Sequence, residues 1–366
     1  MKKIFLILFF AGLGAFCAAD MRAETTGVRY TEAATLTLVG KLFPDTPQPY
    51  HRLDTVRYKG FTKSENRQVR QSSGLAVAFR TDSPFIRVRT EYAAVGTLMN
   101  TCGIAARGYD LYIKDIRGQW LYAGSGANGN GRESDPLTLV KDMDGEMHEC
   151  LLYLPLFSEV RSVQIGVREG STLAPLGTQP FRHRIGIFGS SFTHGASATR
   201  SGMSYPAQFT RKTGIQLLSL GCSGNCKLQS YFADALADAE VEAFLFDTFS
   251  NPNVAEIRSR LFPFIERIQG AHPGKPLIFQ RTIYREGRNF DQGADYIQRR
   301  RTEVADSMMN IACKRYKDVY YIRPNATSPD HLTSVDGIHP NDYGYTLWAD
   351  SIERRVLAIL RKYGIR

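Results

Sequence analysis

The sequence has no block of basic residues of the length that marks a nucleic-acid-binding arm, although 46 Lys and Arg against 36 Asp and Glu give a formal net charge of +10. The basic residues are scattered, so we expect no nucleic-acid partner. Beyond the N-terminus no apolar run is long enough to cross a bilayer, so stable membrane insertion is not expected. Apolar residues at 43% and charged residues at 22% exclude a disordered or collagen-like chain.

Cysteine is scarce, and beyond the N-terminal segment the chain has only Cys102, Cys150, Cys222, Cys226 and Cys313. An odd number leaves at least one thiol unpaired. The close spacing of Cys222 and Cys226 suits a metal site, but no second Cys or His pair of matching spacing completes a zinc tetrahedron. We therefore expect no metal, and either a local disulfide or two separate core residues at these positions.

The N-terminus has the features of a targeting segment. Two lysines precede a short apolar run at residues 4–10, and small residues follow up to Ala19. This order predicts a secretory signal peptide over residues 1–19 and an exported protein, periplasmic or extracellular. Cys17 suggests a lipid anchor, but the bulky Phe16 before it argues against the usual lipoprotein cleavage site.

The length of 366 residues predicts two domains, at roughly 100–200 residues each. Within residues 27–178, apolar and polar side chains alternate, as at residues 75–79, 86–90 and 148–154. Clusters of Gly, Ser, Asp and Pro separate these runs. Alternation with turn residues between the runs is typical of antiparallel strands with one face toward a core. We predict a β-sandwich or jelly-roll domain here, uninterrupted by amphipathic helices.

Residues 183–366 follow a different pattern, strand–loop–helix, repeated. Candidate strands are residues 185–188, 215–220, 243–247, 277–280 and 319–322. Apolar residues at helical spacing lie between them at 257–268, and a last helix is marked at 352–363. Alternating strands and helices indicate a parallel sheet covered on both faces. The fold class is α/β, a three-layer sandwich of about five parallel strands.

Ligands of such sheets bind beyond the carboxyl ends of the strands. The segments that follow the predicted strands are residues 189–195, 221–225, 248–253, 281–285 and 336–340. Together they bring Ser, His, Asp, Gly and Asn to one edge. A nucleophile, a base, an acid that orients it and oxyanion donors are the parts of an acyl-transfer site.

These segments resemble the sequence blocks of the SGNH, or GDSL-type, hydrolases. Residues 189–193 read Gly-Ser-Ser-Phe-Thr, similar to Gly-Asp-Ser-x-Thr, with Ser191 at the nucleophile position. Gly224 and Asn251 match the second and third blocks, and Asp336 with His339 matches the Asp-x-x-His of the last. The resemblance spans residues 183–366.

A second resemblance lies upstream. Gly-Tyr-Asp-Leu-Tyr at residues 108–112 is similar to the Gly-x-Asp-Leu-Tyr signature of the β-rich domain that precedes one bacterial SGNH subfamily. One departure concerns the first block, where Ser190 replaces the Asp that gives the GDSL name. That Asp is not the triad acid of the family, so the triad is retained, and the hydrogen bonding around the nucleophile turn is what the change puts in question.

The resemblance implies a mechanism without a cofactor. His339 would take the proton of the Ser191 hydroxyl and later return it to the leaving alcohol, while Asp336 orients the imidazole. The Ser191 N–H, the Gly224 N–H and the Asn251 amide would stabilise the oxyanion. Hydrolysis is the expected outcome, and transfer of the acyl group to another sugar would use the same triad.

Each assignment has an alternative. Asn253 competes with Asn251 for the oxyanion role, and Gly221 competes with Gly224. Ser191 has the chemistry of a helix N-cap. His339, before a proline, also suits a simple turn.

The remaining candidates have weaker signals. His194 has no acid three residues before it, so we place it in the substrate pocket rather than in the triad. Arg281 and Tyr284 follow a strand end, where substrate contact and a solvated loop are equally compatible with the sequence. Asp110 of the upstream signature suits a structural bond within its turn or at the domain junction.

These expectations converge on an exported carboxylic-ester hydrolase. The expected substrates are short acyl esters, acetyl first, on small molecules or polysaccharides, because the β-domain is of a type often attached to glycan-active enzymes. Two alternatives remain: a lipase or thioesterase acting on longer chains, and a non-catalytic glycan-binding protein.

Overall fold

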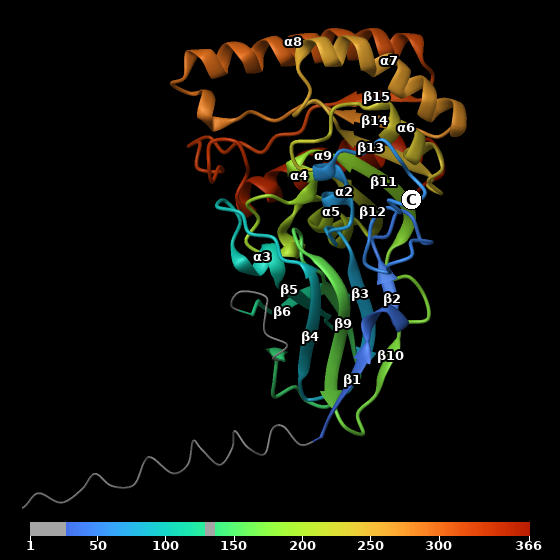
Figure 1. The fold of residues 1–366 in the computed structure, drawn as a ribbon, viewed down its shortest axis with the longest axis vertical. Helices are drawn as coiled ribbons and strands as arrows, with labels where there is room; N and C mark the ends of the chain where they lie inside the picture. Colours follow the sequence, from blue (N-terminus) through green and yellow to red (C-terminus); the bar gives the residue numbers. More distant parts are fainter. Residues whose placement is uncertain (1–26, 129–135) are drawn as a thin grey trace, which may run out of the picture.

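The computed structural model describes residues 27–128 and 136–366. The predicted signal peptide and Cys17 lie outside this range. A β-rich N-terminal region and a helix-rich C-terminal region follow one another along the long axis of the molecule (Figure 1). In the described part of the chain, no helix has both the length and the apolar character needed to cross a membrane.

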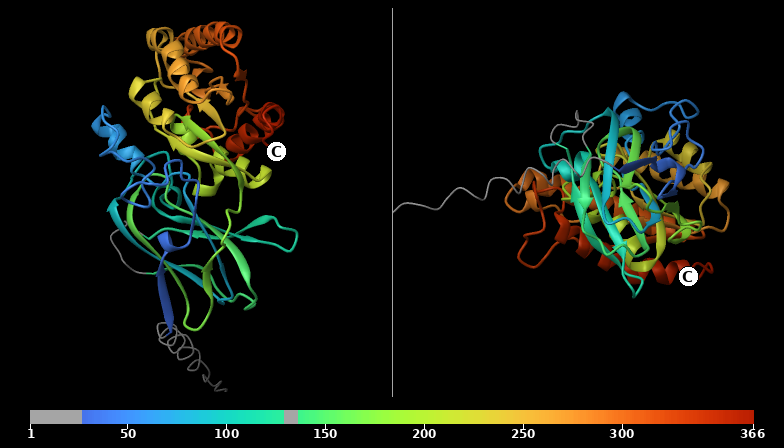
Figure 2. Two further views of the ribbon diagram at one scale, coloured as in Figure 1. Left: turned by 90° about the vertical axis from the view of Figure 1, so that its right-hand side faces the viewer. Right: turned by 90° about the horizontal axis from the view of Figure 1, so that it is seen from below.

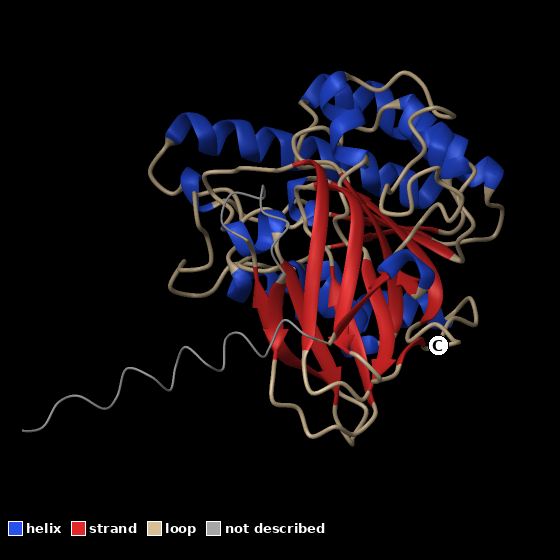
Figure 3. Ribbon diagram, turned by 60° about the horizontal axis from the view of Figure 1, so that its bottom comes forward, coloured by secondary structure: helices blue, strands red, loops and turns tan. Residues whose placement is uncertain are grey.

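The N-terminal region contains two antiparallel sheets, seen as the group of long strands in Figure 3. The first sheet has the order β1 (Val28–Glu32), β9 (Glu159–Arg168), β4 (Ile86–Ala94) and β7 (Leu137–Val140). The second has the order β10 (Leu173–Pro175), β3 (Ala76–Thr81), β8 (His148–Tyr153), β5 (Tyr109–Lys114) and β6 (Trp120–Gly126), with β2 (Thr37–Val39) paired to β3. Buried apolar residues of both sheets form one core, as the predicted sandwich requires.

The alternation of apolar and polar residues along the strands explains part of this packing. In β4, Ile86 and Val88 are buried, whereas the arginines next to them are partly exposed, as predicted. Strand β3 differs, because Ala76 and Ala78 on its other face are also buried, in a cluster with Ala207 of the C-terminal region. The second sheet is therefore covered on one side by its partner sheet and in part, on the other side, by the C-terminal region.

Among the described residues of the β-rich region, two short α-helices interrupt the strands, where the sequence pattern predicts no amphipathic helix. The first, α2 (Lys63–Val69), begins with a capping box in which Thr62 and Glu65 exchange side-chain and backbone hydrogen bonds. The second, α3 (Gly103–Arg107), has only five residues. Neither is long enough to produce a helical period of apolar residues, which is why the sequence pattern did not reveal them.

The C-terminal region is a parallel sheet in the order β12 (Ile215–Gly221), β11 (Arg182–Gly189), β13 (Ala243–Asp247), β14 (Leu277–Gln280) and β15 (Val319–Ile322). Helices α5 (Tyr205–Thr213) and α9 (Asp342–Arg361) share a core with one face, and α6 (Ser230–Ala237), α7 (Val254–Ala271) and α8 (Gln292–Arg315) share one with the other. Figure 2 shows these layers above the β-rich region. The predicted three-layer α/β sandwich is confirmed, with all five strands at the expected places.

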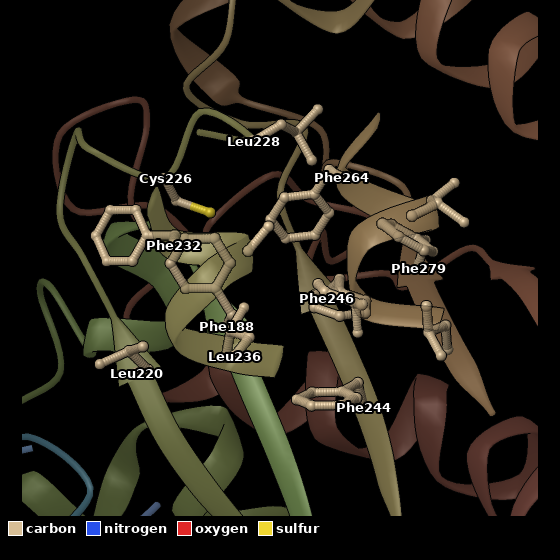
Figure 4. Packing of buried hydrophobic residues seen from close by; sticks show 14 of the residues in the cluster. Phe188, Leu220, Cys226, Leu228, Phe232, Leu236, Phe244, Phe246, Phe264 and Phe279 are labelled. Carbon is tan, nitrogen blue, oxygen red and sulfur yellow. The ribbon is translucent and has the colours of Figure 1, made fainter. Parts of the chain in front are cut away.

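Aromatic side chains fill the core between the sheet and α6 and α7 (Figure 4). The rings of Phe246 and Phe279, on neighbouring strands, stack with centroids 4.6 Å apart. The ring centroids of Phe188 of β11 and Phe232 of α6 lie 4.7 Å apart. Each such burial contributes roughly 1.5–3 kcal/mol. This packing fixes the carboxyl ends of β11, β13 and β14 relative to one another.

A fully buried arginine joins the two regions. Arg52 of the N-terminal region donates from Nη1 to the carbonyl oxygen of Gly221, at the end of β12, over 2.9 Å. Its Nε and Nη2 donate to the carbonyl oxygens of Gln71 and Gln68, at 2.8 and 2.6 Å. Burial lowers the pKa of Arg52 to about 10, so the side chain remains charged at neutral pH. A buried cation needs these carbonyl partners, which ties the β-rich region to the end of the parallel sheet.

Candidate active site

Three neighbouring strands end at the same edge of the parallel sheet. Strand β11 lies between β12 and β13, so the segments after the three strands are adjacent. These segments carry Ser191, Gly224 and Asn251 respectively. The topology therefore brings together the candidate nucleophile and the candidate oxyanion donors.

Ser191 is the first residue of the short helix α4 (Ser191–His194) and is 6% exposed. The N-cap of this helix is Ser190, whose Oγ accepts a hydrogen bond from the Phe192 N–H at 3.2 Å. The capping role suggested as an alternative for Ser191 thus belongs to its neighbour. The Ser191 hydroxyl lies 2.9 Å from His339 Nε2 instead.

His339 and Asp336 form the other half of this hydrogen-bond chain. The imidazole Nδ1 lies 2.8 Å from Asp336 Oδ2. Asp336 Oδ1 accepts the backbone N–H groups of Ile338 and His339, at 2.9 and 2.7 Å, which closes the turn between the two side chains. Partial burial opposes ionisation, but these hydrogen bonds and one from Asn100 hold the pKa of Asp336 well below its usual range. The carboxylate is therefore charged at neutral pH and orients an Nδ1–H tautomer of His339.

Three N–H groups at this edge have no hydrogen-bond partner among the described residues: the Ser191 N–H, the Gly224 N–H and Asn251 Nδ2. The Asn251 side chain is held by its oxygen, which accepts the Cys226 N–H at 3.3 Å. Since the oxygen is engaged with the protein, the Nδ2 group is left to donate elsewhere. Free donors beside a nucleophile are what an oxyanion hole requires.

The rival donors are engaged in structure. Asn253 caps α7, accepting the Glu256 N–H on its side-chain oxygen at 2.9 Å. At Gly221, an added Cβ would lie 2.3 Å from the backbone nitrogen of His194, so close packing of two segments explains that glycine. Gly224 has φ +72° and open space around an added Cβ, so its turn conformation is what favours glycine. These contacts favour Asn251 and Gly224 over their neighbours.

The N-terminal region adds a side chain that the sequence analysis did not identify. Asn100, in the loop before α3, donates from Nδ2 to Asp336 Oδ2 over 2.8 Å, and the same nitrogen lies 3.2 Å from His339 Nδ1. In Figure 1 this loop leads into α3, on the side of the molecule where the segment before α9 runs. No motif marks Asn100, because the contact joins residues 236 positions apart.

A second unpredicted group lies against the turn that carries Ser191. Asp247, the last residue of β13, is fully buried. Its Oδ2 accepts the backbone N–H and the hydroxyl of Ser190, at 3.1 and 2.7 Å, and the hydroxyl of Thr193, at 3.1 Å. Burial raises the pKa of Asp247 to about 6.

Two family models match separate parts of the chain. Residues 182–357 match the GDSL-like lipase/acylhydrolase family, and residues 28–173 match the N-terminus of SGNH-hydrolase-type esterases. A protein described as a GDSL-like lipase from Bacteroides ovatus is 36% identical, with a TM-score of 0.87, and the match covers 91% of this chain and 98% of that one. The chain belongs to the GDSL-like lipase/acylhydrolase family. It is accordingly a carboxylic-ester hydrolase.

More distant structures share the fold of this family member. A salicylyl-acyltransferase from a tetracycline biosynthetic pathway is 21% identical, with a TM-score of 0.68, and the match covers 93% of this chain and 99% of that one. A family two carbohydrate esterase from Cellvibrio japonicus is 10% identical, with a TM-score of 0.56 and coverage of 91% and 98%. A search of curated proteins gave no match.

His194 does not line a substrate pocket in this GDSL-like hydrolase, which corrects the expectation from the sequence. Its side chain is fully buried at the junction of the two regions, with Nε2 2.8 Å from the Leu156 carbonyl oxygen and the ring stacked on Phe157 at 4.2 Å. Burial and the nearby Arg52 charge lower its pKa well below the usual value, so the ring is neutral. His194 packs the regions together and has no access to a substrate.

Arg281 and Tyr284 lie beyond the end of β14 and are bonded to groups of their own loop and of α8. Arg281 Nε donates to Asp306 of α8 at 3.1 Å, and the Tyr284 hydroxyl donates to Asn289 at 2.5 Å. Neither contacts Ser191 or His339 in the described structure. Arg285 approaches the residue that follows Ser191, because its guanidinium lies 5.6 Å from the centre of the Phe192 ring. Its Nη2 donates to the Ser250 carbonyl oxygen at 2.7 Å.

Asp110, from the upstream signature, joins the two regions. Its carboxylate is fully buried and accepts Arg200 Nη1 at 2.8 Å and the Gly202 N–H at 2.9 Å. Arg200 and Gly202 lie in the segment between α4 and α5. The contact agrees with the structural role expected for Asp110.

The cysteines do not form a disulfide or a metal site in the described part of the chain. All five are free thiols, and Cys222 and Cys226 are both buried in the core beside α6. Of the two interpretations of this pair, separate core residues is the correct one. No group of three or more His, Cys, Asp or Glu side chains among the described residues has the arrangement to hold a metal ion.

Proposed function

We propose that this protein is an exported serine esterase that hydrolyses short-chain esters, acetyl esters first, on carbohydrates. Residues 27–178 form its β-sandwich domain and residues 183–366 its catalytic domain. The observation that carries the proposal is the hydrogen-bond chain from Ser191 Oγ to His339 Nε2, 2.9 Å, and from His339 Nδ1 to Asp336 Oδ2, 2.8 Å. This is the geometry in which a serine hydroxyl is activated.

The reaction proceeds in two halves. Ser191 Oγ attacks the ester carbonyl carbon as its proton passes to His339 Nε2. The tetrahedral oxyanion is met by the Ser191 N–H, the Gly224 N–H and Asn251 Nδ2. Collapse breaks the bond to the alcohol, which leaves with the proton from His339, and Ser191 remains acylated. Water then attacks the acyl-enzyme with His339 as base, and the carboxylic acid is released.

Carbohydrate esters are proposed as substrates for two reasons. The predicted signal peptide directs the protein out of the cytoplasm, and polymeric glycans are accessible to an exported protein. The fold, including the β-rich region, is shared with carbohydrate esterases of low sequence identity.

Comparison of wild type with Ser191→Ala on p-nitrophenyl acetate, butyrate and octanoate tests the function. We expect acetate to be hydrolysed fastest, and the variant to lose at least about 10³-fold in kcat. Full activity in a folded Ser191→Ala variant would contradict the proposal. A preference for octanoate would favour a lipase or thioesterase. Binding of glycans without any hydrolysis of acetylated glycans would favour the non-catalytic binding protein.

A further inference from the structure

Asp247 is the point at which three segments of the active site meet. Its carboxylate Oδ2 accepts the Ser190 N–H, the Ser190 hydroxyl and the Thr193 hydroxyl from the nucleophile turn. Its Oδ1 accepts the Ser250 hydroxyl at 3.3 Å, next to Asn251. Its backbone oxygen lies 3.7 Å from Cys226 Sγ, two residues beyond Gly224. One buried residue thus contacts every segment that carries a proposed oxyanion donor.

A glycine next to Asp247 leaves room for the Thr193 hydroxyl to reach the carboxylate. Gly189, the last residue of β11, lies opposite Asp247 in the sheet. An added Cβ on Gly189 would lie 2.0 Å from Thr193 Oγ1 and 2.9 Å from Asp247 Cβ. Only glycine at this position lets the Thr193 hydroxyl reach the carboxylate. The Thr193 hydroxyl also lies 2.8 Å from the Tyr205 hydroxyl, which links the turn to α5.

The charges around Asp247 are unusual for a buried carboxylate. No Lys, Arg or His forms an ion pair with it in the described structure, and all its hydrogen-bond donors are neutral. Tyr205 and Tyr345 are buried nearby, and burial lowers the pKa of Arg285 while the Asp247 carboxylate acts to raise it. A buried carboxylate without a counter-ion costs stability, and the hydrogen bonds that this one accepts all come from segments of the site.

The first block of the family carries an acid directly before the nucleophile serine, and here that position is Ser190. The structure has a serine where the block has the acid, and an acid on the neighbouring strand bonded to that serine. In this chain the acid is the last residue of β13, and the serine follows β11.

We propose that Asp247 is a positioning residue of the nucleophile turn, supplying from β13 the carboxylate that the family's block carries at position 190. It fixes the Ser190 peptide and the first turn of α4, and thereby the direction of the Ser191 N–H and hydroxyl. This inference rests on the proposed function in taking Ser191 as the nucleophile. It adds a residue that acts through the turn and does not touch the substrate.

The test compares Asp247→Asn, Asp247→Ser, Ser190→Ala and Thr193→Val with wild type on p-nitrophenyl acetate. Because the carboxylate places the nucleophile but makes no substrate contact, we expect Asp247→Asn to lower kcat by about 10- to 100-fold and to leave KM within about twofold. Thr193→Val, which removes one of the donors, should lower kcat by about threefold or more. A merely structural role would lower thermal stability without this separation of kcat from KM.

The double variant Ser190→Asp/Asp247→Ser restores the acid to position 190. We expect its kcat to exceed that of Asp247→Ser by about fivefold or more, because the two positions share one hydrogen-bond pair. Asp110→Asn is the matched control, since Asp110 is also a fully buried carboxylate of the protein core. It should lower the melting temperature and leave kcat within about twofold of wild type.

The outcomes are distinguishable. A folded Asp247→Asn variant with wild-type kcat, beside an inactive Ser191→Ala, overturns the role of Asp247 alone. An active Ser191→Ala overturns the proposed function and this inference together. If Asp247→Asn does not fold, Ser190→Ala and Thr193→Val decide, and wild-type kcat in both overturns the inference.

Discussion

The two regions of the molecule place functional side chains in different ways. In the C-terminal region, each candidate catalytic residue follows a strand of a parallel sheet or lies in the last loop, and a short sequence block marks it. In the N-terminal region, Asn100 reaches Asp336 from a loop that no block marks. The candidate site residues of the parallel sheet can therefore be found from short sequence blocks. The contribution of the β-rich region depends on how that region packs against the sheet.

The two regions are held together in part by buried polar contacts. Of the substitutions considered, Arg200→Ala should lower stability the most. Asp110 would then be a buried carboxylate without its cation, and such losses cost about 3–5 kcal/mol. We expect a corresponding fall in the free energy of unfolding, measured by urea denaturation. Because Asp110 is bonded across the junction, both regions should lose stability together. Unchanged stability would mean that this contact does not hold the regions together.

Within the C-terminal region, Asn251→Ala and Asn253→Ala form a matched pair. Loss of an oxyanion donor typically costs about 10²–10³-fold in kcat, and we expect this for Asn251→Ala. Asn253→Ala removes the cap of α7 and should cost about 1 kcal/mol of stability with kcat unchanged. Steady-state kinetics and thermal denaturation of both variants check the assignment. A large fall in kcat for Asn253→Ala alone would reverse it.

Asn100→Ala should have the smallest effect and bears most directly on the contribution of the N-terminal region. The Asn100 amide helps to hold the pKa of Asp336 low, so its removal raises that pKa. The backbone N–H groups of Ile338 and His339 still hold Asp336 charged near neutral pH, so the expected loss comes from a less firmly oriented carboxylate and imidazole. At neutral pH we expect a loss of about tenfold or less in kcat.

Steady-state kinetics near neutral pH measure this loss. Met99→Ala, in the same loop and with a fully exposed side chain, serves as the control and should keep the wild-type kcat. Identical kcat values for Asn100→Ala and wild type would mean that the N-terminal region does not contribute to catalysis through Asn100.

Much of this architecture follows from the sequence because its signals are local. The alternation at residues 86–90 and the helical spacing at 257–268 depend on neighbours a few positions apart, and both appear in the structure as predicted. The helices α2 and α3 were missed because they are too short to establish a period. His194 was misplaced because proximity to Ser191 in the sequence does not show which way a side chain points on a short helix.

The sequence by itself determined the alternation of strands and helices in the C-terminal region, the family, and the residues that follow the parallel strands, since hydrophobic period and block spacing are properties of short segments. Tertiary structure decided the rest: that Asn100 reaches Asp336, that the carboxylate beneath the nucleophile comes from Asp247, and that His194 is enclosed at the junction. These contacts join residues 57 to 236 positions apart or depend on the docking of two regions. Only the packing of a buried core brings such residues together, because no local preference of the chain encodes a distance across it.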